Sequence, residues 1–150
     1  MSYTIAVRVY QTNVEAFFHV VEKTVWHYAN GGTWHEFQGE HILTMGGSGT
    51  SGTLRFDSDT GESFLVALGV HNYKRWCDIV TGLNPGETGV VIHREYYHGS
   101  ERDNGLSRGY VREGQWASYE VQSLGDQQRK FEVVYSVAQG RNLRANVIIH

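Results

Sequence analysis

A chain of 150 residues forms one ordinary domain and leaves no room for two independent hydrophobic cores. Apolar residues make up 40% of the chain and charged residues only 19%, with a net charge of −3. This composition excludes a disordered chain, and it argues against a nucleic-acid-binding protein, which needs a strongly basic face. Valine and isoleucine number 23, against 15 for leucine and alanine, so we expect a single mainly-β domain over 1–150.

The first half of the chain reads as strands. Residues 3–10 alternate between two faces, with Tyr3, Ile5, Val7 and Val9 on one of them, which predicts a half-buried strand. Further strands are expected at 17–28, within 33–45 as a pair that turns near Gln38-Gly39, and at 53–57 and 62–69 as a hairpin around 59–61.

Residues 72–81 show a different spacing. Trp76, Ile79 and Val80 fall at helical intervals, Asn72 is a suitable N-cap, and Gly82 closes the segment, so the pattern predicts a short helix. The rest of the chain adds strands expected at 89–97, 115–122, 130–137 and 146–150. Together these elements are most simply arranged as a two-sheet sandwich with a helical excursion in the middle.

Cellular context is inferred from what the sequence lacks. Cys77 is the only cysteine, so an intrachain disulfide is excluded. The N-terminal residues show no basic segment followed by an apolar stretch, and no run approaches the roughly 20 apolar residues of a membrane span. We therefore expect a cytoplasmic protein.

Two segments resemble catalytic or cofactor motifs without completing them. The glycine-rich segment Gly46–Gly52 approaches a phosphate-binding loop, but no lysine precedes Thr53, and a strand follows it. A flexible turn and a backbone-lined ligand cradle both remain open for it. His35, Glu36 and His41 lack the spacing of a zinc protease helix. We expect no catalytic centre, metal or cofactor.

The densest polar cluster is the segment from Val70 to Thr81. It reads either as a capped, solvated helix or as part of a sugar site. Sugars offer hydroxyls that both donate and accept, together with an apolar C–H face, so their partners are amides, hydroxyls, charged groups and aromatic rings. Composition alone leaves the choice between these two readings open.

Four long motifs identify a resemblance that covers the chain from Ser2 to about Ile149. These motifs are Tyr10-Gln11-Thr12, Tyr28-Ala29-Asn30-Gly31-Gly32-Thr33-Trp34, Met45-Gly46-Gly47-Ser48-Gly49-Thr50-Ser51-Gly52 and Val70-His71-Asn72-Tyr73-Lys74-Arg75-Trp76-Cys77-Asp78. Through them the chain closely resembles the fungal fruit-body lectins, a family of mushroom proteins.

This resemblance implies an actinoporin-like β-sandwich whose two sheets are joined by a short helix–loop–helix region. It also implies a homotetramer that lacks enzymatic activity and binds glycans at two sites in each protomer. One site would bind Galβ1-3GalNAc, the Thomsen–Friedenreich antigen, through its GalNAc, and the other would bind terminal GlcNAc. By residue-for-residue matching, the first site would comprise Ala29, Ser48, Gly49, His71 and Asn72.

The second site would comprise Asp78, Ile79, Thr81, an arginine and Tyr119. Asp78 would accept hydrogen bonds from sugar hydroxyls, while Ile79 and Thr81 would supply backbone groups and the N-acetyl contact. The arginine is ambiguous, because this chain has about six extra residues at 103–108. Counting from Tyr96-Tyr97 favours Arg102, and counting back from Tyr110 favours Arg108; we prefer Arg102.

Two other functions compete with a lectin. A membrane-active, pore-forming protein is suggested by the likeness to actinoporins, but pore formers need an amphipathic N-terminal helix, and residues 2–11 alternate as a strand does. A glycosidase usually needs two carboxylates that flank one bond, whereas only Asp78 is expected at a sugar site.

Overall fold

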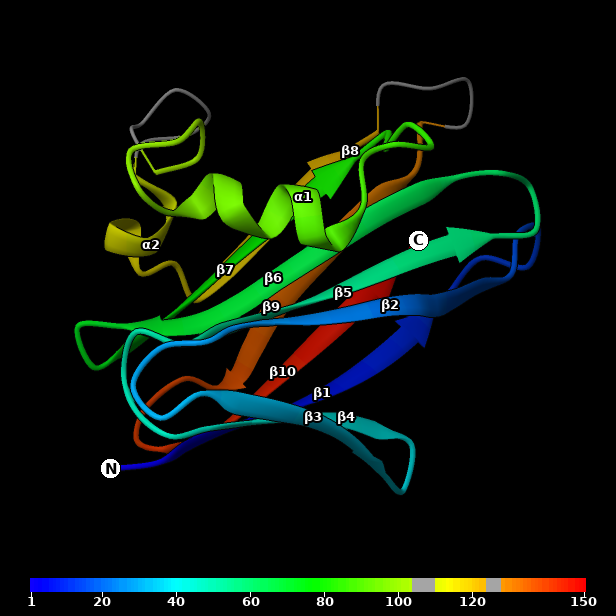
Figure 1. Ribbon diagram of the computed structural model, residues 1–150. Helices are drawn as coiled ribbons and strands as arrows, with labels where there is room; N and C mark the ends of the chain where they lie inside the picture. Colours follow the sequence, from blue (N-terminus) through cyan, green and yellow to red (C-terminus); the bar gives the residue numbers. More distant parts are fainter. Residues whose placement is uncertain (104–109, 124–127) are drawn as a thin grey trace.

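Two β-sheets stacked face to face form the body of the protein (Figure 1). A computed structural model describes residues 1–103, 110–123 and 128–150. In spatial order the six-stranded sheet contains β3 (Gly32–Phe37), β4 (Glu40–Met45), β1 (Tyr3–Gln11), β10 (Asn142–Ile149), β9 (Lys130–Val137) and β8 (Ser118–Gln122). The four-stranded sheet contains β2 (Phe18–Trp26), β5 (Ser51–Ser58), β6 (Ser63–His71) and β7 (Lys74–Thr81).

The main core fills the space between the sheets. Along β1 the alternation predicted from the sequence places Tyr3, Ile5 and Val7 in this core, while Thr4 and Ala6 face outward. β1 pairs with β10 in parallel and with β4 in antiparallel register. The N-terminal segment is therefore a central strand, as its period of two predicted, and not the helix that a pore former needs.

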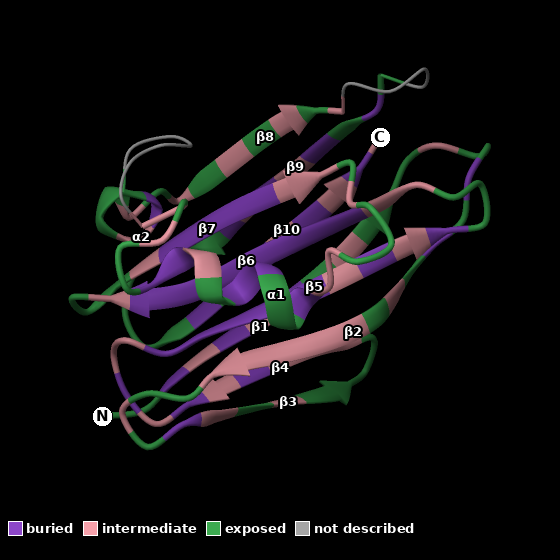
Figure 2. Ribbon diagram, turned by 45° about the horizontal axis from the view of Figure 1, so that its top comes forward, coloured by how far each residue is buried: buried purple, intermediate pink, exposed green. Residues whose placement is uncertain are grey.

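A second, smaller core lies on the outer face of the four-stranded sheet. Short helical elements cover that face: α1 (Gly89–His93), the 3-10 turn η1 (Arg94–Tyr96) and α2 (Val111–Gly114). Trp76 of β7 and Tyr96 of η1 are fully buried there, and their ring centroids lie 5.2 Å apart. Figure 2 shows the consequence: β6 is buried from Phe64 to Val70, and β7 is buried in its middle, from Trp76 to Ile79. The expected two-sheet sandwich with a short helical region is confirmed.

The prediction of a helix over 72–81 is wrong, because this segment forms a hairpin turn followed by β7. Asn72 and Tyr73 both have positive φ, 48° and 66°, and they join His71 to its partner Lys74. Two consecutive left-handed residues are typical of a tight type I′ hairpin. β7 is covered on both faces, so Trp76, Cys77 and Ile79 are all buried. Burial on both faces removes the alternation that would have indicated a strand.

The prediction of a strand over 89–97 is also wrong. The run Gly89-Val90-Val91-Ile92 is rich in β-branched residues, yet it forms α1 because its free amides are capped. Thr88 accepts a hydrogen bond from the amide of Val91 at 3.4 Å. Glu22 of β2 accepts from the amide of Gly89 at 2.6 Å and from that of Val90 at 3.3 Å. Capping by a distant strand therefore outweighs the local preference.

The other strands differ from the predictions only at their ends. The pair within 33–45 turns at Gln38-Gly39 as expected, and the hairpin around 59–61 is β5–β6. The strand expected from 115 begins at Ser118, because α2 occupies the preceding residues. The strand expected from 146 begins earlier, at Asn142, where it pairs with Thr4. No helix of the described residues is long and apolar enough to cross a membrane.

Candidate functional site

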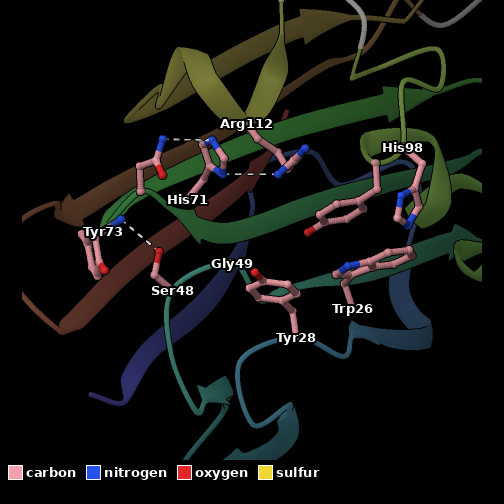
Figure 3. Close-up of a pocket in the computed structure, with 10 residues that line it drawn as sticks. Trp26, Tyr28, Ser48, Gly49, His71, Tyr73, His98 and Arg112 are labelled. Carbon is pink, nitrogen blue, oxygen red and sulfur yellow. Dashed lines mark hydrogen bonds between the residues drawn. The ribbon is translucent and has the colours of Figure 1, made fainter.

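A cavity of about 450 Å³ opens where the β6–β7 turn, the glycine-rich loop and the end of β2 meet the segment between η1 and α2 (Figure 3). Four of the five residues predicted for the first sugar site line this cavity, although they are far apart in the sequence. The lining residues are Trp26, Tyr28, Ser48, Gly49, His71, Asn72, Tyr73, Tyr97, His98 and Arg112.

Gly49 lets the glycine-rich loop pass close to an aromatic ring. Its φ is +102°, and a Cβ built on it would lie 2.4 Å from Cδ1 of Tyr28. Its amide donates to the carbonyl of Val70 at 2.8 Å, which ties the loop to the end of β6. Only glycine fits this conformation and this spacing. Of the two readings left open for the glycine-rich segment, the close approach at a cavity favours the cradle over a merely flexible turn.

Ser48 joins the glycine-rich loop to the β6–β7 turn. Its Oγ accepts a hydrogen bond from the amide of Tyr73 at 3.0 Å, and this bond holds the turn against the loop. Ala29, the fifth predicted residue, does not line the cavity itself. It follows Tyr28, has a φ of 46°, and its carbonyl would lie 2.6 Å from a Cβ at Gly46. Ala29 is thus packed against the loop, next to the cavity wall.

His71 and Asn72 form the polar side of the cavity. Nη1 of Arg112 lies 3.2 Å from Nδ1 of His71, and Nδ2 of Asn72 lies 3.3 Å from Nε2 of the same ring. The side chain of Gln115 donates to the His71 carbonyl at 2.7 Å. Burial lowers the pKa of His71, and the positive charge of Arg112 lowers it further. The imidazole is therefore neutral at neutral pH.

Next to this polar side stands an aromatic wall, formed by Trp26, Tyr97 and the guanidinium of Arg112, which contacts both His71 and the Tyr97 ring. The rings of Trp26 and Tyr97 stack in parallel, with centroids 4.0 Å apart and planes inclined by 6°. The Arg112 guanidinium carbon lies 4.4 Å from the Tyr97 ring centroid. The Tyr97 hydroxyl bonds to Ser51, and burial raises the pKa of Tyr97 to about 12. Such a wall offers a flat apolar face beside hydrogen-bonding groups, as sugar sites do.

Asp78 and Arg102, two residues predicted for the second site, lie near one another around Tyr96. Asp78 faces the small core from β7, is 3% exposed, and accepts a hydrogen bond from the Tyr96 hydroxyl at 2.6 Å. The guanidinium carbon of Arg102 lies 5.9 Å from the Tyr96 ring centroid, and its Nε is 3.3 Å from a Glu95 carboxylate oxygen. Arg108 lies outside the described residues.

Three further residues predicted for the second site, Ile79, Thr81 and Tyr119, lie on β7 and β8. Ile79 points into the main core, so only its backbone could meet a ligand. Thr81 ends β7, and Tyr119 lies on the adjacent edge strand β8, partly buried against the main core. Tyr119 also lines a hollow of about 440 Å³ with the half-exposed ring of Trp116.

Sequence reasoning missed six of the ten residues that line the first cavity. It did not single out Trp26, Tyr73, Tyr97, His98 or Arg112, which come from four separate segments. Tyr28, also missed, and Tyr73 stood in quoted motifs, next to Ala29 and Asn72, and could have been found from them. For Tyr97 and Arg112 no signal was available, because the segments that carry them were predicted as a strand and a loop.

The histidines and carboxylates do not assemble a metal site in the part of the chain that the structure describes, where no group of three candidate ligands occurs. Glu36 and His41, two of the residues that resembled a zinc motif, face each other across the β3–β4 hairpin. Nδ1 of His41 lies 3.7 Å from a Glu36 oxygen. The two residues therefore form a cross-strand pair.

Comparison with known proteins agrees with this architecture. The chain matches the family described as fungal fruit body lectin over residues 1–147. It is 59% identical over 149 residues to Boletus edulis lectin from Boletus edulis, and the match covers 99% of each chain. The crystal structure of wild-type Xerocomus chrysenteron lectin is 60% identical, has a TM-score of 0.90 and is matched over 100% of both chains. The chain therefore belongs to the fungal fruit body lectin family.

Proposed function

We propose that this carbohydrate-binding protein takes Galβ1-3GalNAc into the cavity beside the glycine-rich loop, through the GalNAc residue. The observation that carries the proposal is the convergence of Ser48, Gly49, His71 and Asn72 in the lining of a cavity that also holds the stacked rings of Trp26 and Tyr97. Fixed hydroxyl and amide groups discriminate between sugar epimers, because an axial hydroxyl either meets its partner or leaves that partner unpaired. We propose binding without turnover, which a glycosidase assay tests.

Replacement of Asn72 tests this proposal most directly. Asn72→Ala removes the side-chain amide from the cavity, and we expect affinity for GalNAc to fall about ten- to a hundredfold, or about 1–3 kcal/mol. Isothermal titration calorimetry measures the change, with Asn84→Ala as the control because Asn84 bonds to Glu87 and does not line the cavity. Unchanged GalNAc binding in a folded Asn72→Ala variant would contradict the assignment.

A second site for terminal GlcNAc is proposed around Asp78. A helix over 72–81 would place Asp78 about 9 Å from Asn72 along its axis. In the structure Asn72 lies in the β6–β7 turn, and Asp78 lies four residues along β7 from Lys74, or about 13 Å at about 3.3 Å per residue, so the two sites are further apart than a helix would allow. Asp78→Asn keeps the shape of the side chain but removes its charge. We expect it to lower GlcNAc affinity about tenfold or more and to leave GalNAc affinity unchanged. Loss of both sugars in a folded protein would indicate one shared site.

The arginine of the second site can be identified by a paired test. Arg102 lies beside Tyr96, whose hydroxyl binds Asp78, and this contact supports Arg102 over Arg108. We expect Arg102→Ala to weaken GlcNAc binding about tenfold and Arg108→Ala to change it little. GalNAc binding serves as the internal control and stays intact in both variants. The reverse ranking in a titration would assign the role to Arg108.

Assembly into a homotetramer completes the proposed function. Single sugar sites bind weakly, and several sites on one particle convert weak binding into avidity for glycan-bearing surfaces. The proposed partners are glycans and glycoproteins that carry Galβ1-3GalNAc or terminal GlcNAc. Multi-angle light scattering tests the assembly, and a monomer at working concentration would contradict it.

A further inference from the structure

His71 lies between two hydrogen-bond donors, and a neutral imidazole can accept from only one. Nη1 of Arg112 approaches Nδ1 at 3.2 Å, and the side-chain nitrogen of Asn72 approaches Nε2 at 3.3 Å. Arginine only donates, whereas the carboxamide of asparagine carries both a donor and an acceptor and can exchange them by a half-turn. The conflict is therefore resolved at Asn72.

Arg112 has little freedom to turn away from His71. Its Nε donates to the carbonyl of Tyr96 at 2.7 Å, its Nη2 donates to Asp103 at 2.8 Å, and its plane lies over the Tyr97 ring. These three contacts point Nη1 at the ring nitrogen. Nδ1 of His71 must then carry the lone pair, and Nε2 must carry the hydrogen.

We propose that Arg112 is a positioning residue of the sugar cavity: by donating to Nδ1 of His71 it selects the Nε2–H tautomer, which draws Oδ1 of Asn72 inward and presents the Asn72 amide N–H groups to the ligand. This inference rests on the proposed function for its ligand, but the tautomer does not depend on any sugar. The proposal fixes the direction of the hydrogen bond between Asn72 and the ligand: Asn72 donates, and the ligand must offer an acceptor.

Acid should break this arrangement. A protonated His71 carries hydrogen on both nitrogens, so Nδ1–H would meet the donor of Arg112. The charged groups that act on His71 are Arg112, Asp103 and Glu113, and Lys74 lies opposite it in the hairpin. Arg112 lowers the pKa of His71, whereas Glu113 and Asp103 raise it, and burial lowers it most. Sugar affinity is therefore expected to fall below neutral pH as the ring gains its second proton.

Nitrogen-15 NMR of the ligand-free protein tests the tautomer directly. At about pH 7.5 we expect His71 to show a protonated Nε2 and a bare Nδ1. Arg112→Met, which keeps an apolar stem without the donor, should populate the other tautomer and raise the pKa of His71. Glu113 is exposed and its negative charge raises the pKa of His71. Glu113→Gln is therefore the control that should change this pKa in the opposite direction, by lowering it. A protonated Nδ1 in the wild-type protein overturns the proposal, even if Arg112→Met fails to fold.

A second measurement tests the direction of the contact with GalNAc. Asn72→Asp keeps an acceptor for Nε2–H of His71 but offers the ligand no donor, so we expect a loss of about tenfold or more, as for Asn72→Ala. Binding of Asn72→Asp within about twofold of wild type would show that Asn72 accepts from the ligand, and would overturn the proposal. If the wild-type protein does not bind GalNAc at all, the proposed function fails while the NMR result still decides the tautomer.

Discussion

Gly49→Ala is expected to abolish GalNAc binding at the first cavity, with a loss of about a hundredfold or more, or about 3 kcal/mol. The new Cβ would lie 2.4 Å from Cδ1 and 2.6 Å from Cε1 of Tyr28, and φ at this position is +102°. The loop, the ring or both must move, and Ser48 and Tyr28 line the cavity on either side. Calorimetry with GalNAc measures the loss.

Gly61→Ala is the matched control for this substitution. Gly61 also has a positive φ, +89°, but a Cβ there meets nothing within 4 Å, and the residue lies in the β5–β6 turn. We expect a loss of about 1 kcal/mol in unfolding free energy from backbone strain, with sugar binding unchanged. Wild-type affinity in a folded Gly49→Ala variant would mean that the loop does not contact the sugar.

Acid is expected to destabilise the fold through His93, which lies beneath the aromatic wall. The ring is 3% exposed, its Nδ1 lies 2.8 Å from the hydroxyl of Thr24, and its Nε2 lies 2.8 Å from that of Ser51. Burial lowers the pKa of His93 from 6.5 to about 4. Between these two values the unfolded chain binds a proton that the folded protein does not, so stability rises with pH through this window.

The size of this effect follows from the shift in pKa. A fall in the pKa of His93 from 6.5 to about 4 corresponds to about 3 kcal/mol of unfolding free energy, which is fully present above about pH 6.5 and lost by about pH 4. Urea unfolding at a series of pH values measures it. His93→Gln cannot titrate and retains groups that bond to Ser51 and Thr24, so its stability should vary less over the same range. A variant curve parallel to that of the wild type would assign the pH dependence to other groups.

The sequence predicted the strands that are buried on one face or joined by recognisable turns. Buried and less buried residues alternate along β1. In the β3–β4 hairpin, Gln38-Gly39 supplies a glycine where the turn needs a positive φ. It failed at β7, where burial on both faces produced a helix-like spacing and where the turn used Asn72-Tyr73 in place of an asparagine–glycine pair. It failed again at α1, because the carboxylate that caps this helix comes from Glu22, and nothing local signals so distant a partner.

The candidate site likewise contains some residues that could be predicted from the sequence and others that could not. The residues of the loop and the turn, Ser48, Gly49 and Asn72, were found because they stand in long motifs. Trp26, Tyr97 and Arg112 were missed because each depends on how the helical segment covers the four-stranded sheet. A flat wall assembled from three segments has no signature in any one of them.

The parallel pairing of β1 with β10 also governs when this protein can fold. Thr4 pairs with Asn142, 138 positions later, and these two strands lie side by side at the centre of the six-stranded sheet. Contacts between such distant residues close a long loop and are typical of slow folding. A chain still emerging from the ribosome without β10 exposes one whole edge of β1, so the sheet can be completed only after synthesis has passed Ile149. Until then that edge is open to pairing with another chain.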